Sequence, residues 1–249
     1  MEPTDDAMDA QPVAELRGVQ KRYGKIEALR GVDLQIRPGE LVALLGPNGA
    51  GKTTVVSILL GQRRPDAGSA ALFGHDPTVP AARRPVGATP QLAGFPDNLT
   101  VAEVVDLVGV HYPDPTPAGE LLGRFGLEEV AGRRACRLSG GQWRRLAVAL
   151  AFGGRPRLVV MDEPTTGLDV EARRRLWEVL RAFVANGDAV LLTTHYLEEA
   201  QALASRVVVI AGGRIIAHGS VDQITAHAGL HLERTSLEEA VLRLIGGAS

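Results

Sequence analysis

Nine consecutive residues near position 50 combine glycines, a lysine and threonines at a spacing that suits a polyphosphate. The segment reads Gly46, Pro47, Asn48, Gly49, Ala50, Gly51, Lys52, Thr53 and Thr54. Glycine lacks the Cβ atom that would block close approach, so successive backbone N–H groups can point at phosphate oxygens. The Lys52 ammonium can then reach the terminal phosphates, and the Thr53 hydroxyl can bind Mg²⁺. The segment therefore predicts a loop that holds a nucleotide.

The residues on either side of this loop predict the elements that position it. Residues 41–45 form a continuous apolar run, which is typical of a buried strand in a parallel sheet. Residues 53–60 are expected to continue as a helix, whose positive N-terminal end favours a bound anion. The alternative is a glycine-rich turn that carries a lysine by chance. Such a turn would require neither the strand before it nor the helix after it.

A second group of candidate residues follows another short apolar strand, at 158–161. Asp162 and Glu163 come directly after it, and Pro164 ends the run. Two acids at the end of a buried strand are costly unless they meet a cation or a proton. Asp162 therefore fits the role of holding Mg²⁺ through water, and Glu163 the role of polarising an attacking water. Two ordinary solvated acids are the alternative, which the Pro164 and the polar segment 165–169 disfavour.

A third motif lies between these two, at residues 138–142. Its sequence is Leu138, Ser139, Gly140, Gly141 and Gln142. Ser139 is a good helix N-cap, and a helix is expected to continue through residues 143–150. The N-terminus of that helix would be a second anion site.

The three motifs together resemble the ATP-binding subunits of ABC (ATP-binding cassette) transporters, over residues 14 to 220. In that family two cassettes pair head to tail, and ATP lies between the phosphate loop of one and the signature motif of the other. The resemblance implies ATP and Mg²⁺ as cofactors. It also implies that the signature contacts the nucleotide held by the opposite subunit, through Ser139, Gly140, Gly141 and Gln142.

Four further positions carry residues that the resemblance assigns to the ATP site. Tyr23 resembles the aromatic residue that stacks on adenine. Gln91 resembles a glutamine that contacts Mg²⁺ and the attacking water. His195, after the apolar strand 189–192, resembles a histidine that contacts the γ-phosphate. Asp169 resembles an aspartate that links the two sites of the dimer. Outside such motifs a tyrosine is more often a core residue, a glutamine an ordinary loop residue and a histidine a structural one.

The order of strands and helices predicts an α/β fold with a mostly parallel sheet. The resemblance narrows this to the P-loop NTPase core of an ABC cassette, spanning residues 13–220, with an antiparallel β flank near residues 13–40. A helical subdomain that bears the signature is expected at about 92–154. Residues 1–12 are expected to be a disordered leader, and residues 221–249 a short helical tail.

Composition limits the classes of partner. The net charge is −2 and aromatic residues make up 4% of the chain, so no basic, aromatic-rich surface for nucleic acid is expected. The single cysteine, Cys136, suits a reducing cytoplasm. No secretory signal and no run of about 18–20 apolar residues is present. Any membrane passage is therefore expected to belong to a separate integral permease subunit, with this chain on the cytoplasmic face of the membrane. The contact is expected near Gln91, with Phe95 and Leu99 as exposed anchors.

The C-terminal segment 236–245 and the phrase 194–200 resemble subunits that serve ABC-2-type exporters, the group that includes bacterial drug and antibiotic exporters. Leu237, Val241, Leu244 and Ile245 are expected on one helical face, after a capping box at Ser236. One alternative is a soluble ABC ATPase that acts in cofactor assembly or on nucleic acid or ribosomes. The other is a nucleotide-gated binding module without hydrolysis, which the presence of Glu163 and His195 disfavours.

Overall fold

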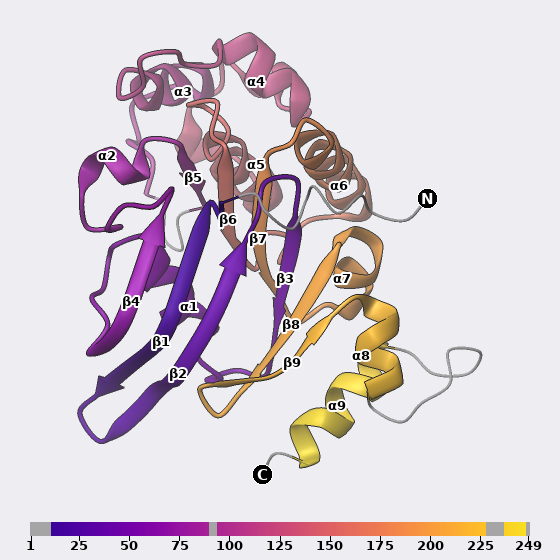
Figure 1. Ribbon diagram of the computed structural model, residues 1–249. Helices are drawn as coiled ribbons and strands as arrows, with labels where there is room; N and C mark the ends of the chain where they lie inside the picture. Colours follow the sequence, from indigo (N-terminus) through magenta and orange to yellow (C-terminus); the bar gives the residue numbers. More distant parts are fainter. Residues whose placement is uncertain (1–10, 90–93, 228–236, 248–249) are drawn as a thin grey trace.

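The computed structural model describes residues 11–89, 94–227 and 237–247. A small antiparallel sheet comes first along the chain, with the order β2-β1-β4. Its strands are β1 (Ala14–Tyr23), β2 (Ile26–Ile36) and β4 (Ala67–Leu72). Figure 1 shows this sheet along one side of the larger sheet. The antiparallel flank expected near residues 13–40 is confirmed, and β4 joins it from further along the chain.

The larger sheet has six strands in the order β5-β6-β7-β3-β8-β9. Its first five strands in this order are parallel, and β9 runs antiparallel to β8. The strands are β3 (Leu41–Leu45), β5 (Val86–Ala88), β6 (Leu158–Asp162), β7 (Ala189–Thr194), β8 (Arg206–Ala211) and β9 (Arg214–Gly219). This confirms the α/β fold with a mostly parallel sheet.

The central strand β3 is buried on both faces, as its continuous apolar sequence predicts. Val42 and Leu44 face a core cluster shared with the small sheet and with α1 (Lys52–Leu59). Ala43 and Leu45 face the C-terminal helices instead. The same alternation lets α1 pack between the two sheets while other helices cover the far face.

A helical lobe lies at one end of the larger sheet (Figure 1). It consists of α3 (Val101–Gly109), α4 (Ala118–Arg124), the 3₁₀ turns Glu128–Val130 and Ala135–Arg137, and α5 (Gly140–Leu150). A capping box between Thr100 and Glu103 fixes the start of α3. The first half of α5 is half-buried or exposed, whereas residues 146–150 are buried in the core beneath. Helix α5 therefore connects the lobe to the core.

Two apolar residues near the start of this lobe are less exposed than the sequence analysis expected. Phe95 and Leu99 are half-buried and pack against the core cluster beneath the lobe. The Phe95 ring also lies 5.4 Å, centroid to centroid, from the ring of Trp143 on α5. The expectation that they form exposed anchors was wrong, because the short segment before α3 folds back onto α5.

The remaining helices lie outside this lobe. They are α2 (Pro80–Arg83), α6 (Val170–Ala185), α7 (Leu197–Leu203), α8 (Val221–His227) and α9 (Leu237–Gly247). Helix α2 packs through Ala82 on the cluster beside α1, and the others cover the opposite face and the C-terminal end. Leu237, Val241, Leu244 and Ile245 share one cluster with β3 and β8, which confirms the predicted apolar face of α9. Ser236, the expected cap, lies outside the described residues. Within the described ranges, no helix combines the length and apolar character that a membrane span requires.

Candidate active site

The phosphate loop connects β3 to α1 as the sequence predicts. The Lys52 side chain is buried, and its ammonium folds back on the loop, donating to the carbonyl oxygens of Gly46 at 2.6 Å and Pro47 at 3.2 Å. Asn48 and Gly49 are exposed at the turn. The loop is therefore closed around its own lysine, whose charge lies where the terminal phosphates of a nucleotide would enter.

Two glycines of this loop are required for different reasons. A Cβ atom on Gly46 would lie 2.2 Å from the carbonyl oxygen of Ile210 in β8. Gly49 has open space around it but a φ of 80°, which L-residues rarely adopt. Gly46 is thus needed for packing of the loop on its own sheet, whereas Gly49 leaves its backbone open on the side where a ligand would lie.

Oxygen atoms converge at the end of β6, beside the start of α1. Thr53 Oγ1 donates to Asp162 Oδ2 at 3.0 Å, and the hydroxyl of Thr193 donates to Asp162 Oδ1. The Asp162 N–H donates to Thr89 Oγ1 at 3.3 Å. The parallel register brings this about, because Asp162 of β6 lies opposite Thr193 of β7. Hydroxyl and carboxylate oxygens are the ligands that Mg²⁺ prefers.

Glu163 follows in a turn with an unusual backbone. Its φ is 49°, in the left-handed region that costs a non-glycine residue about 1–2 kcal/mol. Its N–H donates to the carbonyl oxygen of Thr193 at 3.0 Å and to its hydroxyl at 3.1 Å. His195 Nδ1 lies 3.1 Å from Glu163 Oε1, and both side chains are partly exposed. The turn thus brings the two predicted catalytic side chains into direct contact.

The signature motif begins α5 through a complete capping box. The Gln142 N–H donates to Ser139 Oγ at 3.3 Å, and the Ser139 N–H donates to Gln142 Oε1 at 3.1 Å. This confirms Ser139 as the N-cap. Gly140 remains exposed and Gly141 half-buried. The helix end therefore offers free space at its two glycines.

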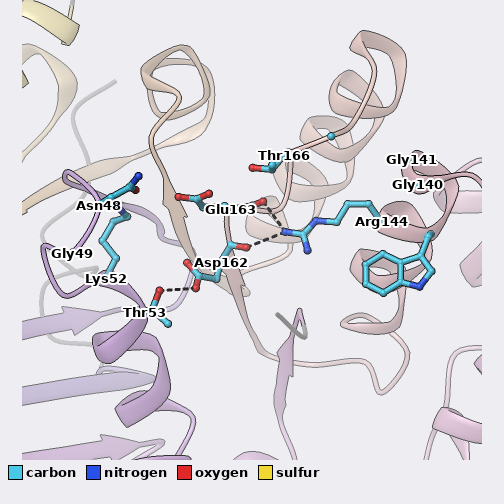
Figure 2. A pocket seen from close by; sticks show the side chains of 12 residues that line it. Asn48, Gly49, Lys52, Thr53, Gly140, Gly141, Arg144, Asp162, Glu163 and Thr166 are labelled. Carbon is cyan, nitrogen blue, oxygen red and sulfur yellow. Dashed lines mark hydrogen bonds between the residues drawn. The ribbon is translucent and has the colours of Figure 1, made fainter. Parts of the chain in front are cut away.

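A cleft of about 610 Å³ brings these motifs together in one chain. Figure 2 shows Lys52 and Thr53 on one side, Gly140, Gly141 and Arg144 on the other, and the two carboxylates between them. The cleft is lined by Asn48, Gly49, Lys52, Thr53, Gly140, Gly141, Trp143, Arg144, Asp162, Glu163, Thr166 and Gly167. Residues of all three motifs from the sequence analysis therefore lie around a single opening.

Arg144 crosses this cleft to the turn after β6. Its Nη2 donates to the carbonyl oxygens of Asp162 at 3.1 Å and Glu163 at 2.7 Å, and its Nε to that of Pro164 at 3.3 Å. Burial lowers the pKa of Arg144, and the two nearby carboxylates oppose that shift. The guanidinium still carries its charge at neutral pH.

The predicted site residues Tyr23 and Asp169 do not line this cleft and lie outside the three motifs. Tyr23 is 41% exposed at the end of β1, where Lys21 Nζ lies 5.8 Å from its ring centroid. Asp169 caps α6 by accepting from the Ala172 N–H at 2.8 Å. Gln91 lies outside the described residues.

The sequence analysis missed the buried carboxyl of Glu199 on α7. Glu199 Oε2 accepts from Thr165 Oγ1 at 3.3 Å, which ties α7 to the segment after Glu163. Burial raises its pKa above the usual 4.5, while the hydroxyls of Thr194 and Thr165 act in the opposite direction. An acidic residue at an apolar helical position was the available sequence signal. Thr193 and Arg144 gave no such signal, because only the strand register and the tilt of α5 bring them to Asp162.

Comparisons with known proteins agree with this geometry. Residues 29–166 match the ABC transporter family. The chain is 40% identical to the Nod factor export ATP-binding protein I of Ralstonia nicotianae, over 91% of this chain and 73% of that protein. It is 39% identical to the daunorubicin/doxorubicin resistance ATP-binding protein DrrA of Streptomyces peucetius, over 95% and 74%.

Solved structures lead to the same family. An ATP-binding subunit of an ABC transporter superposes with a TM-score of 0.85 at 29% identity, covering 93% of this chain and 99% of that one. A dimeric post-hydrolysis state of an ATP-binding cassette with ADP and Pi gives a TM-score of 0.75 at 25% identity, over 83% and 98%. The chain therefore belongs to the ABC transporter family, as one of its ATP-binding and ATP-hydrolysing cassettes.

Proposed function

We propose that this cassette is the motor subunit of an exporter. Its relatives include ATP-binding proteins for Nod factor export and for daunorubicin and doxorubicin resistance, each about 40% identical over most of the chain. The observation that carries the proposal is the cluster at the end of β6, where Asp162 meets Thr53 and Glu163 meets His195 beside the phosphate loop. This is an arrangement for cleaving a nucleotide, and it favours a motor over a passive binding module.

The roles of the individual residues follow from their positions. Lys52 and the loop N–H groups would hold the phosphates, and Glu163 would orient and polarise a water in line with the γ-phosphate. His195 would contact the γ-phosphate while its Nδ1 fixes the Glu163 carboxylate at 3.1 Å. Catalysis of phosphoryl transfer is mostly positioning and charge neutralisation. Among the residues proposed here, the resemblance alone supports Gln91 as a further contact to the water.

The oxygen atoms of Thr53 and Asp162 suit Mg²⁺. They lie 3.0 Å apart at the mouth of the cleft, on the side of Lys52. Two protein oxygens are a typical protein share of a Mg²⁺ site, since nucleotide phosphates and waters supply the rest. When bound there, Mg²⁺ supplies positive charge against the phosphate oxygens. Thr53 and Asp162 would hold it, with Thr193 fixing the second carboxylate oxygen of Asp162.

We propose further that two cassettes pair around ATP, either as identical copies or as paralogues. The dimeric post-hydrolysis structure supports pairing, and the open glycines at the start of α5 support a signature available to an opposite subunit. Tyr23 would stack on adenine, and residues 139–142 would close on the nucleotide from the partner. Asp169 would combine its capping of α6 with a contact across the dimer.

The membrane contact is proposed at a second cleft, of about 670 Å³, beside the helical lobe. Phe95 and Leu107 line it, and Leu107 is 45% exposed on α3. Val110, just past the end of α3, is 75% exposed. An apolar, exposed rim suits an integral permease subunit. The cassette would then lie peripherally on the cytoplasmic face of the membrane and drive transport by closing and parting.

Mixing two inactive variants tests the composite site. Lys52→Ala removes the phosphate-loop cation and Ser139→Arg blocks the signature, so each variant alone forms dimers with two damaged sites. A mixed dimer has one intact site and one doubly damaged site. We expect ATP hydrolysis to rise on mixing, to a maximum near equal amounts. If no ratio restores hydrolysis, a disulfide between cysteines placed at Ser139 and Gly49 on different subunits decides whether the motifs meet across a dimer.

A soluble ABC ATPase without a permease is the second candidate. Recovery of the full chain with membranes separates the two functions, since the exporter subunit requires co-expression with an integral subunit from its own genome. If the chain stays in the soluble fraction with every such subunit, the exporter proposal fails and the soluble role replaces it. ATP hydrolysis by the isolated chain is expected for both candidate functions, so that result would not count against it.

A further inference from the structure

Three consecutive backbone carbonyl groups point at a single guanidinium. They belong to Asp162, Glu163 and Pro164, and Arg144 donates to them at 3.1, 2.7 and 3.3 Å. Figure 2 shows the Arg144 side chain extended from α5 towards this turn. Charge-assisted hydrogen bonds of this kind are roughly twice as strong as neutral ones. The contact therefore constrains the turn on the side opposite to Thr193.

The turn needs such support because of its backbone. Glu163 has a φ of 49°, a conformation that persists only where surrounding groups hold it. On one side the N–H of Glu163 donates to both oxygens of Thr193. On the other side its carbonyl oxygen has the shortest of the three Arg144 contacts, at 2.7 Å. The direction of the Glu163 carboxylate thus depends on α5 as well as on the sheet.

Arg144 also lies close in sequence to the signature. It is in the second turn of α5, the helix whose N-terminal residues Gly140 and Gly141 line the cleft. A helix moves as a rigid rod over such a short distance, so any tilt of its N-terminus also moves the guanidinium. If the signature serves the ATP of the opposite subunit, α5 joins one ATP site to the catalytic carboxylate of the other.

We propose that Arg144 is a positioning residue that couples the two ATP sites through each chain. It holds the Glu163 carboxylate in its catalytic direction according to the position of α5. Glu163 at one ATP site is then correctly oriented when the signature of the same chain has closed on the ATP of the other site. The inference rests on the proposed dimer and on the proposed role of Glu163. It assigns Arg144 no contact with the nucleotide; the Nε and Nη2 groups instead donate to the three carbonyls.

Steady-state hydrolysis by Arg144→Gln and Arg144→Lys tests this role. For Arg144→Gln we expect kcat to fall roughly 10–100-fold, the range for a catalytic group misplaced by about 1 Å. The Hill coefficient for ATP should fall towards 1, below a maximum of about 2 for two coupled sites. Binding of a fluorescent ATP analogue should stay within about twofold of wild type. Arg144→Lys keeps the charge and should recover part of both kcat and the Hill coefficient.

Arg83→Gln provides the matched control. Arg83 is also half-buried and donates to a backbone carbonyl, that of Pro77 at 2.6 Å, but it lies on α2. Its kcat and Hill coefficient should match wild type. If Arg144→Gln and Arg144→Lys lower ATP hydrolysis only in proportion to a loss of thermal stability, Arg144 is merely structural and the proposal is overturned.

Two further outcomes would overturn the proposal, and a third would overturn the function on which it rests. An unchanged Hill coefficient in Arg144→Gln, with kcat reduced, would limit Arg144 to its own chain and overturn the coupling. A strong loss of ATP binding would mean that the guanidinium contacts phosphate, which also overturns it. If Glu163→Gln hydrolyses ATP at the wild-type rate in the same assay, the proposed function itself has failed.

Discussion

Replacing Glu163 by glutamine separates the chemistry of the site from its architecture. The turn that carries Glu163 is held by backbone contacts to Thr193 and Arg144, none of which involves the carboxylate. The one side-chain contact described is that with His195, at 3.1 Å and partly exposed. An exposed pair of this kind contributes about 0–1 kcal/mol. Since 1 kcal/mol corresponds to about 2–4 °C in a domain of this size, the melting temperature should change little.

Hydrolysis should respond on a different scale. Loss of a general base typically lowers the rate by about 10²–10⁴, which corresponds to roughly 2.7–5.4 kcal/mol in the activation barrier. Single-turnover hydrolysis of radiolabelled ATP and calorimetric melting measure the two effects on the same sample. The variant should bind ATP and accumulate as an ATP-bound dimer on a sizing column. Glu120→Gln, which removes an exposed glutamate paired with Arg124 on α4, should hydrolyse ATP normally. Turnover of Glu163→Gln within about threefold of wild type would remove Glu163 from the mechanism.

Three further substitutions test other parts of the structure. Gly46→Ala would place a Cβ 2.2 Å from the carbonyl oxygen of Ile210, so we expect lower thermal stability and weaker ATP binding. Overpacking of this kind typically lowers the free energy of unfolding by about 1–3 kcal/mol. Glu199→Gln should raise the melting temperature at pH 8 by about 2–4 °C, because the neutral amide avoids burying a charge. That gain should shrink as the pH falls towards 4.5, where the wild-type carboxyl is itself protonated. Leu107→Glu should reduce recovery with membranes in cells that also express the permease.

Each of these has an outcome that would count against it. A Gly46→Ala variant as stable as wild type would mean that β8 shifts freely beneath the loop. A stability gain for Glu199→Gln that is equal at pH 5 and pH 8 would exclude the titration of Glu199 as its source. For Leu107→Glu the control is Leu242→Glu, the same change on the exposed face of α9. Equal membrane recovery for both variants would move the docking surface away from α3.

The sequence predicted the local parts of the site well, because they depend on neighbouring residues. The order of β3, phosphate loop and α1 follows from apolar runs and glycines within 20 residues, and the Ser139 cap follows from its own helix. The contact of Glu163 with His195 could not be predicted in this way. It joins residues that lie 32 positions apart, each just past the end of its strand, and only the register of β6 against β7 brings them together.

Exposure was harder to predict than secondary structure. Phe95 was expected on the surface as an anchor of the membrane contact near Gln91, yet it packs on Trp143. Such a contact depends on how the lobe folds back, which periodicity does not describe. The same applies to Arg144, whose contacts with the turn after β6 depend on how α5 lies against that turn. The domain boundaries at 13, 220 and 221 and the roles assigned to single site residues stay predictions.

The two halves of α5 constrain how this family member can change in length. Residues 146–150 are anchored in the core, whereas residues 140–142 present the signature. One residue inserted between them would turn the signature by about 100° and shift it by about 1.5 Å relative to the anchored half. The connection between α3 and α4 is exposed at residues 113–115, and a change of length there does not rotate one part of a helix against another. Insertions there would change the outline of the lobe. The number of residues from Ser139 to Leu146, in contrast, must stay constant for the signature to keep its direction.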